Sequence, residues 1–136
     1  MDEKNASRVR ILVADDNQLM RTGLCAILQE HADWEVCGEA ADGTQAIHMA
    51  LELKPDVLVL DISMPDLNGF EVAKRIHELS SAPDILIVTG HDASTFEHVQ
   101  PQSGVRGFVG KSRISSDLVP AIEALAGHRK ASVTAV

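Results

Sequence analysis

The sequence lacks the features of a membrane protein, a secreted protein or a thiolate metal site. Its 136 residues include no apolar run close to the roughly 20 residues that span a bilayer, and residues 1–10 lack the apolar core of a signal peptide. The two cysteines, Cys25 and Cys37, do not have metal-ligand spacing, so we expect buried free thiols in a reduced compartment. These absences favour a cytoplasmic chain without a membrane segment.

Basic residues are also scarce. The chain has 12 Lys and Arg against 20 Asp and Glu, which gives a formal net charge of −8 at pH 7. Surfaces that bind DNA are normally basic, because neutralising phosphates supplies much of the affinity. We therefore expect no nucleic-acid contacts within this chain. The apolar fraction of 45% is that of an ordinary globular protein, and the length predicts about one domain.

What the sequence does have is a regular alternation of short apolar runs with longer amphipathic stretches. Strands are expected at residues 9–14, 34–41, 57–60, 85–88 and 107–109. Helices are expected on the apolar positions of residues 20–28, 46–51, 72–79, 93–99 and 115–126. This fivefold βα order with right-handed crossovers predicts a single α/β domain, in which helices cover both faces of a parallel sheet.

Charged and hydroxyl side chains come directly after four of these strands. They are Asp15 and Asp16 after the first strand, Asp61 after the third, Thr89 after the fourth and Lys111 after the fifth. Open α/β sheets bind ligands outside the carboxyl ends of their strands. We therefore expect these side chains to meet at one edge of the sheet.

Three carboxylates at one edge repel each other, and a bound cation removes that cost. Mg²⁺ (or Mn²⁺) suits such a site because it takes oxygen ligands and is usually completed by a phosphate. Lys111 adds a positive charge and Thr89 a hydrogen-bond donor. Aspartate is a known covalent nucleophile for phosphoryl groups, and phosphoryl transfer mainly needs positioning and charge neutralisation. The set therefore predicts phosphoryl chemistry at this edge.

Four motifs carry these residues in order: Asp15-Asp16, Asp61-Ile-Ser-Met-Pro-Asp-Leu-Asn-Gly69, Thr89-Gly90, and Gly107-Phe-Val-Gly-Lys111. Together they resemble the receiver domain of two-component response regulators, over nearly the whole chain. The resemblance implies a doubly wound, flavodoxin-like (βα)5 fold with strand order 2-1-3-4-5. We expect the receiver at residues 9–127, an N-terminal tail at 1–8, and at 128–136 a tail or the start of a linker to an output domain outside this chain.

The resemblance also implies a role for each motif residue. Asp61 would accept the phosphoryl group, and the metal would be held by Asp15, Asp16, Asp61 and the backbone carbonyl of Ser63. Asp16 would be a direct ligand, and Asp15 would either hold metal-bound water or also ligate the metal. Lys111 and Thr89 would assist at the phosphoryl oxygens.

Two residues are implied as a switch, in which Thr89 moves toward the phosphoryl group and Phe108 changes rotamer. Modulation of the site is expected from Ser63, Gly90 and His91. Gly90 stands where the family usually has alanine. His91 occupies a variable position that tunes hydrolysis, and it would either slow water by crowding or assist it by positioning.

The implied partners are a sensor histidine kinase or a histidine phosphotransfer protein, and a possible second copy of the chain. The stretch from Gly104 to Ser112 resembles receivers of the NarL/FixJ type, which usually precede a DNA-binding domain, so we favour a fragment of a transcription factor over a stand-alone receiver. One alternative is a pseudo-receiver that binds proteins without phosphorylation. The other is an enzyme, but the first βα turn lacks G-x-G-x-x-G and no separate general acid or base is apparent. We therefore expect catalysis only of the chain's own phosphorylation and dephosphorylation.

Overall fold

The computed structural model describes residues 8–90 and 104–134, with the backbone alone described from residue 128. Its strands are β1 (Val9–Ala14), β2 (Trp34–Ala40), β3 (Val57–Asp61), β4 (Asp84–Thr89) and β5 (Val105–Gly110). Its helices are α2 (Gln18–Gln29), α3 (Gly43–Leu53), α4 (Gly69–His77) and α5 (Ile114–Thr134), with a short 3-10 helix, η3 (Lys111–Arg113), before α5. The helix expected at 93–99 lies outside the described residues.

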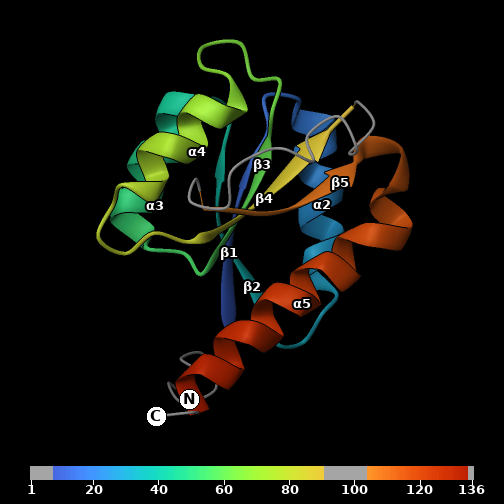
Figure 1. Cartoon of the computed structure of the whole chain (residues 1–136). Coiled ribbons are helices and arrows are strands. Elements are labelled where there is room, and N and C mark those ends of the chain that lie inside the picture. The colour runs from blue at the N-terminus through green and yellow to red at the C-terminus, as the bar shows by residue number, and fades with distance from the viewer. Residues whose placement is uncertain (1–7, 91–103, 135–136) are drawn as a thin grey trace.

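The five strands form one sheet in the order β2-β1-β3-β4-β5, and each neighbouring pair is parallel. Figure 1 shows α3 and α4 on one face of the sheet and α2 and α5 on the other. This architecture confirms the predicted doubly wound α/β fold and its strand order. The carboxyl ends of β1, β3, β4 and β5 consequently share one edge.

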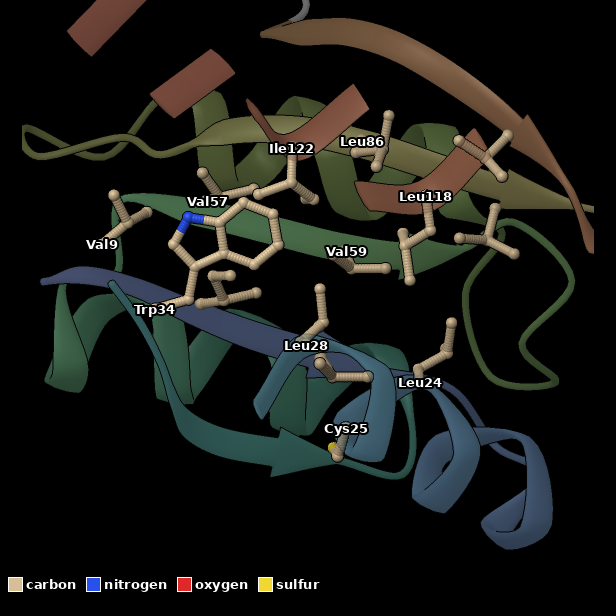
Figure 2. Close-up of a cluster of buried hydrophobic side chains, with 14 of the residues drawn as sticks. Val9, Leu24, Cys25, Leu28, Trp34, Val57, Val59, Leu86, Leu118 and Ile122 are labelled. Atoms are coloured by element: carbon tan, nitrogen blue, oxygen red, sulfur yellow. The ribbon is translucent and has the colours of Figure 1, made fainter. Parts of the chain in front are cut away.

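Alternation along the central strands divides the core into two layers. Val57 and Val59 belong to a cluster with α2 and α5, while Leu58 and Leu60 belong to a cluster with α3 and α4. Every residue of β3 is buried, as expected of a central parallel strand. Figure 2 shows the first cluster, in which the Trp34 ring lies near Val57 and Ile122.

Side-chain caps start three of the helices. Asn17 accepts a hydrogen bond from the Met20 N–H at 2.9 Å and so forms the N-cap of α2. Asp42 and Asn68 do the same for α3 and α4, at 2.8 and 2.9 Å. Each cap satisfies a backbone donor that has no partner within its own helix. The helices that follow β1, β2 and β3 therefore have fixed starting points.

Three local expectations differ from the structure. The last helix does not end at residue 126 but continues to Thr134, because Gly127 is not in the left-handed conformation that usually ends a helix; among the described glycines only Gly104 has a positive φ. Strand β5 spans 105–110 rather than 107–109. Cys25 is buried as predicted, but Cys37 is partly exposed because β2 lies at the edge of the sheet.

No helix in residues 8–90 or 104–134 is long and apolar enough to cross a membrane.

Candidate functional site

The ends of β1 and β3 bring three carboxylates together. Asp61 is the last residue of β3 and is 1% exposed, and Asp15 follows β1 and is fully buried. Asp16, beside it, is exposed. Carboxylate oxygens of Asp15, Asp16 and Asp61 lie within 4.8 Å of one another. The cluster expected from the sequence therefore exists.

Lys111 completes the site from the end of β5. Its Nζ lies 3.3 Å from Oδ1 of Asp61, and its side chain is 28% exposed against 1% for Asp61. Three carboxylates thus face one ammonium group. When all are ionised, the cluster keeps a formal excess of two negative charges, which a divalent cation would balance.

Two buried oxygens in this cluster have no hydrogen-bond partner among the described residues. Asp61 Oδ1 accepts from the Ser63 N–H at 3.1 Å, and Asp15 Oδ1 accepts from the Asn17 N–H at 2.8 Å. Oδ2 of Asp61 and Oδ2 of Asp15 are the orphaned atoms. A buried carboxylate oxygen without a partner is costly. These oxygens fit a hard cation, which binds through oxygen ligands.

Burial also affects the protonation of Asp15. Loss of solvent raises the pKa of its carboxyl above the usual value, and the charge of Asp61 adds to the rise. The N–H of Asn17 opposes this shift, as does the charge of Lys111. Without a cation, the environment of Asp15 therefore disfavours the ionised form of its carboxyl group.

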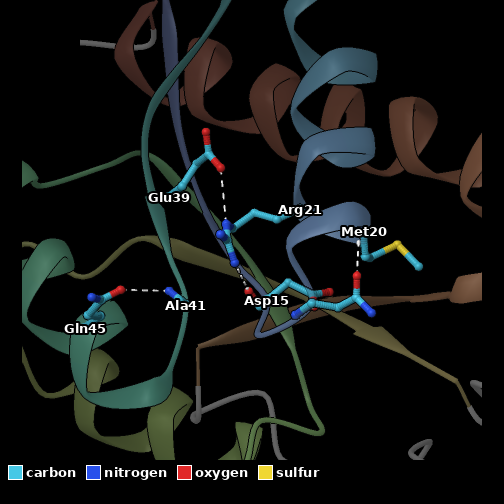
Figure 3. A network of polar contacts seen from close by, with 7 residues as sticks. Asp15, Met20, Arg21, Glu39, Ala41 and Gln45 are labelled. Atoms are coloured by element: carbon cyan, nitrogen blue, oxygen red, sulfur yellow. Dashed lines mark hydrogen bonds and ion pairs between the residues drawn. The ribbon is translucent and has the colours of Figure 1, made fainter.

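Arg21 on α2 is a residue that the sequence did not single out. Its guanidinium donates from Nη1 to the backbone carbonyl of Asp15 at 2.6 Å, and its Nε lies 3.2 Å from Oε1 of Glu39 on β2 (Figure 3). The side chain is 15% exposed. Arg21 thus fixes the chain directly after β1. Its position, one turn into the helix after the acidic pair, was the available signal, but the role of Glu39 required the fold.

The two residues expected to form a switch, Thr89 and Phe108, lie on the two strands beyond β3. Thr89 is the last residue of β4 and is fully buried. Asp61 pairs with Val88, so Thr89 stands one residue further along at the same edge. Phe108 pairs with Ile87 and is partly exposed, and it packs against the core layer formed with α3 and α4.

Gly90 follows Thr89 in open surroundings. A Cβ built on it would meet nothing within 4 Å. His91 lies outside the described residues. A second residue that the sequence did not single out, Asp66, lies in the loop between β3 and α4, and its exposed carboxylate contacts α3.

An apolar groove of about 490 Å³ opens beside the site, between α2 and the start of α5. Lys111 lines it together with Leu19, Met20 and Ile114. Leu19 is 83% exposed. The same lysine therefore borders both the acidic cluster and an apolar surface.

Comparisons with known proteins identify this arrangement. Residues 11–123 match the family model of the response regulator receiver domain. The chain is 33% identical over 116 residues to the transcriptional regulatory protein LiaR of Bacillus subtilis. The aligned region covers 85% of this chain and 55% of LiaR. The chain spans about half the length of the curated relatives it matches.

Solved structures agree with the sequence match. A LuxR-family two-component response regulator from Aurantimonas superposes with a TM-score of 0.82 at 34% identity, over 90% of this chain and 87% of that one. The signal receiver domain of the response regulator NarL from Mycobacterium tuberculosis gives a TM-score of 0.80 at 30% identity, over 89% and 98%.

Proposed function

The chain belongs to the family of response regulator receiver domains, and from this premise we propose that it accepts a phosphoryl group on Asp61. The observation that carries the proposal is the state of the Asp61 carboxylate. One oxygen is held by Lys111 and the Ser63 N–H, while the other is buried with no hydrogen-bond partner in residues 8–90 and 104–127, beside two further carboxylates. Such an oxygen is positioned for a cation and for an electrophile.

The metal ligands would be the carboxylates of Asp15, Asp16 and Asp61 and the backbone carbonyl of Ser63. We propose Mg²⁺ or Mn²⁺, since the donors are oxygens and the metal must leave room for a phosphoryl group. A bound ion would supply positive charge to the oxygens of the group in transfer.

The donor would be a phosphohistidine on a sensor histidine kinase or a histidine phosphotransfer protein. An oxygen of Asp61 forms the new bond to phosphorus while the P–N bond to the donor imidazole breaks. The electron pair of that bond stays on the imidazole nitrogen, which takes up a proton. Lys111 stabilises the negative charge on the phosphoryl oxygens, and Thr89 donates a hydrogen bond to them. Water later hydrolyses the acyl phosphate, so the chain catalyses only its own modification and its reversal.

A protein donor needs a surface beside Asp61 on which to dock. The groove between α2 and α5 supplies one, because Leu19 exposes an apolar side chain next to Lys111. Small apolar grooves with a few exposed large side chains are typical of sites for partner helices. We propose that the phosphodonor protein binds here.

Phosphorylation would change the shape of the edge formed by β4 and β5. The modification adds about −1.5 to −2 charges at pH 7. In our proposal Thr89 moves toward the new oxygens, and Phe108 moves inward because space opens behind Thr89. The altered face would act on a second copy of the chain or on a transcriptional output domain. We place the receiver at residues 9–127, although α5 itself continues to Thr134.

The test is intact mass spectrometry after incubation with acetyl phosphate and Mg²⁺. We expect one phosphate adduct on the wild-type chain, and none on Asp61→Asn or after chelation with EDTA. Lys111→Met is expected to slow the adduct by about 10²-fold or more, because it removes a preorganised charge from the site. An adduct of equal yield on Asp61→Asn would overturn the assignment. A wild-type chain that stays unmodified would instead favour the pseudo-receiver.

A further inference from the structure

The loop between β3 and α4 is fixed to a second helix by one exposed carboxylate. Oδ1 of Asp66 accepts from the N–H of Gly43 at 2.8 Å, and Oδ2 accepts from the N–H of Thr44 at 3.0 Å and from its hydroxyl at 2.9 Å. Gly43 and Thr44 are the first residues of α3. Asp66 thus joins the phosphoacceptor loop to the positive end of a neighbouring helix.

Helix α3 does not need this carboxylate as its cap. Asp42 already occupies the N-cap position and accepts from the Gln45 N–H at 2.8 Å. Asp66 takes the two N–H groups that Asp42 leaves, and it does so from a loop more than twenty residues further along the chain. The contact therefore serves the loop as much as the helix.

The loop itself is short and closed at its base. The Gly69 N–H donates to the Ile62 carbonyl at 2.9 Å, and the Ser63 N–H donates to Oδ1 of Asp61. Between these two fixed points the loop carries Asp66. A change in the position of Asp66 would therefore be transmitted to Ser63, three residues away, whose N–H donates to the phosphoacceptor Asp61.

Helix α3 approaches the loop closely at Gly43. A Cβ on Gly43 would lie 2.8 Å from Cγ2 of Val72 and 3.1 Å from Oδ1 of Asp66. The absence of a side chain at this position lets the backbone N–H reach the carboxylate. The contact therefore depends both on the carboxylate of Asp66 and on the missing side chain of Gly43.

We propose that Asp66 is a positioning residue for phosphoryl acceptance, which holds the loop so that Ser63 and Asp61 present their oxygens to the metal. This inference rests on the proposed function. Outer contacts that orient metal ligands commonly change metal affinity by about 10- to 100-fold when removed. Asp66 acts through the loop and does not touch the metal or the phosphoryl group.

The protonation of Asp66 supports a permanent contact. The Gly43 and Thr44 donors hold the pKa of its carboxyl at about 2. The Asp66 carboxylate thus stays ionised throughout the neutral range, and the strength of its contact with α3 does not depend on small changes of pH.

The experiment compares Asp66→Ala with Asp42→Ala in the full chain. Both variants remove a carboxylate that accepts hydrogen bonds from the start of α3, but only Asp66→Ala releases the loop between β3 and α4. We would measure the Mg²⁺ dissociation constant by isothermal titration calorimetry with MgCl₂, the melting temperature, and amide hydrogen exchange at Ser63. We expect Asp66→Ala to raise the dissociation constant by about 10-fold and to speed exchange at Ser63. Asp42→Ala should lower the melting temperature without changing the dissociation constant.

Asp66→Asn keeps one oxygen acceptor but loses the charge, so we expect an intermediate dissociation constant; it also serves if Asp66→Ala fails to fold. An unchanged Mg²⁺ affinity in the Asp66 variants would overturn this inference alone. Equal losses of affinity in the Asp66 and Asp42 variants would also overturn it, because the effect would then be stability of α3. A wild-type chain without Mg²⁺ affinity would overturn the proposed function itself.

Discussion

Asp15 and Asp61 each leave one buried carboxylate oxygen without a hydrogen-bond partner among the described residues. The other oxygen of Asp15 accepts from the Asn17 N–H, and the other oxygen of Asp61 contacts both the Ser63 N–H and the Lys111 ammonium group. An ordinary core would avoid such groups, because unpaired buried charges are destabilising. In the proposed function a cation binds these oxygens and removes that cost.

The proposed switch is tested at Phe108. Phosphorylation of the wild-type chain is expected to change amide hydrogen exchange over β5, residues 105–110, because Phe108 moves. Phe108→Leu should cost less than about 1.5 kcal/mol, since the volume change is modest. The variant should still be phosphorylated, but phosphorylation should change the amide hydrogen exchange of β5 much less than in the wild-type chain.

The matched control for this experiment is Phe70→Leu, the same substitution at the start of α4. It should leave the phosphorylation-dependent exchange of β5 as in the wild type. Full exchange changes in Phe108→Leu would disprove the coupling.

Local patterns in the sequence predicted only part of the site. Asp61 was predictable because it ends an apolar run, and Asp15 because it follows one. Arg21 and Asp66 were not, since each acts on a group that is distant in sequence: Arg21 on Glu39, and Asp66 on the start of α3. Contacts of this kind depend on how elements pack, and no local pattern records them.

At the scale of elements, the turn from β3 into α4 depends on a close backbone approach. A Cβ on Gly69 would lie 2.6 Å from Cα of Ile62, and the Gly69 N–H closes the loop onto the Ile62 carbonyl. Glycine is therefore required here by space and not by a left-handed conformation. Within the described residues the positions of the elements were well predicted, whereas the end of α5 was not, because Gly127 suits either a helix interior or a helix end.

Two glycine substitutions should have opposite effects on stability. Gly69→Ala must displace the backbone of Ile62, and we expect it to destabilise the chain by about 1–3 kcal/mol. Gly23→Ala lies within α2, where a Cβ meets nothing within 4 Å. It should stabilise by about 0.5–1 kcal/mol, because alanine loses less backbone entropy in a helix. Urea unfolding of both variants checks this. A stabilising Gly69→Ala would show that the loop tolerates a side chain.

At the scale of the whole molecule, the α2 and α5 side of the sheet also carries the groove that leads to Lys111. The opposite side, covered by α3 and α4, exposes Leu51 instead. The alternation of elements predicted helices on both faces. The order of the strands came from the resemblance, because periodicity along a chain does not fix which strands are neighbours.

Docking of the phosphodonor is tested with two matched charge substitutions. Leu19→Asp places a charge in the groove, and Leu51→Asp places one on the opposite side of the sheet. We would measure phosphoryl transfer from a phosphorylated histidine phosphotransfer protein that modifies the wild-type chain.

Leu19→Asp should slow this transfer by about tenfold or more, as expected for an anchor residue of an interface. The rate with acetyl phosphate should stay the same, because that donor needs no docking surface. Leu51→Asp should leave both rates unchanged. If Leu19→Asp slows both donors equally, the groove affects the chemistry and is not the docking surface.

The alternating faces of β3 also constrain how this molecule can evolve. Val57 and Val59 pack in one core layer, and Leu58 and Leu60 pack in the other. Asp61 is the next residue in this alternation. Deleting or inserting a single residue in this strand would exchange the two layers and turn the terminal carboxylate away from its partners. The length of this strand should therefore be inherited unchanged, even where the apolar side chains at residues 57–60 have been replaced by other apolar ones.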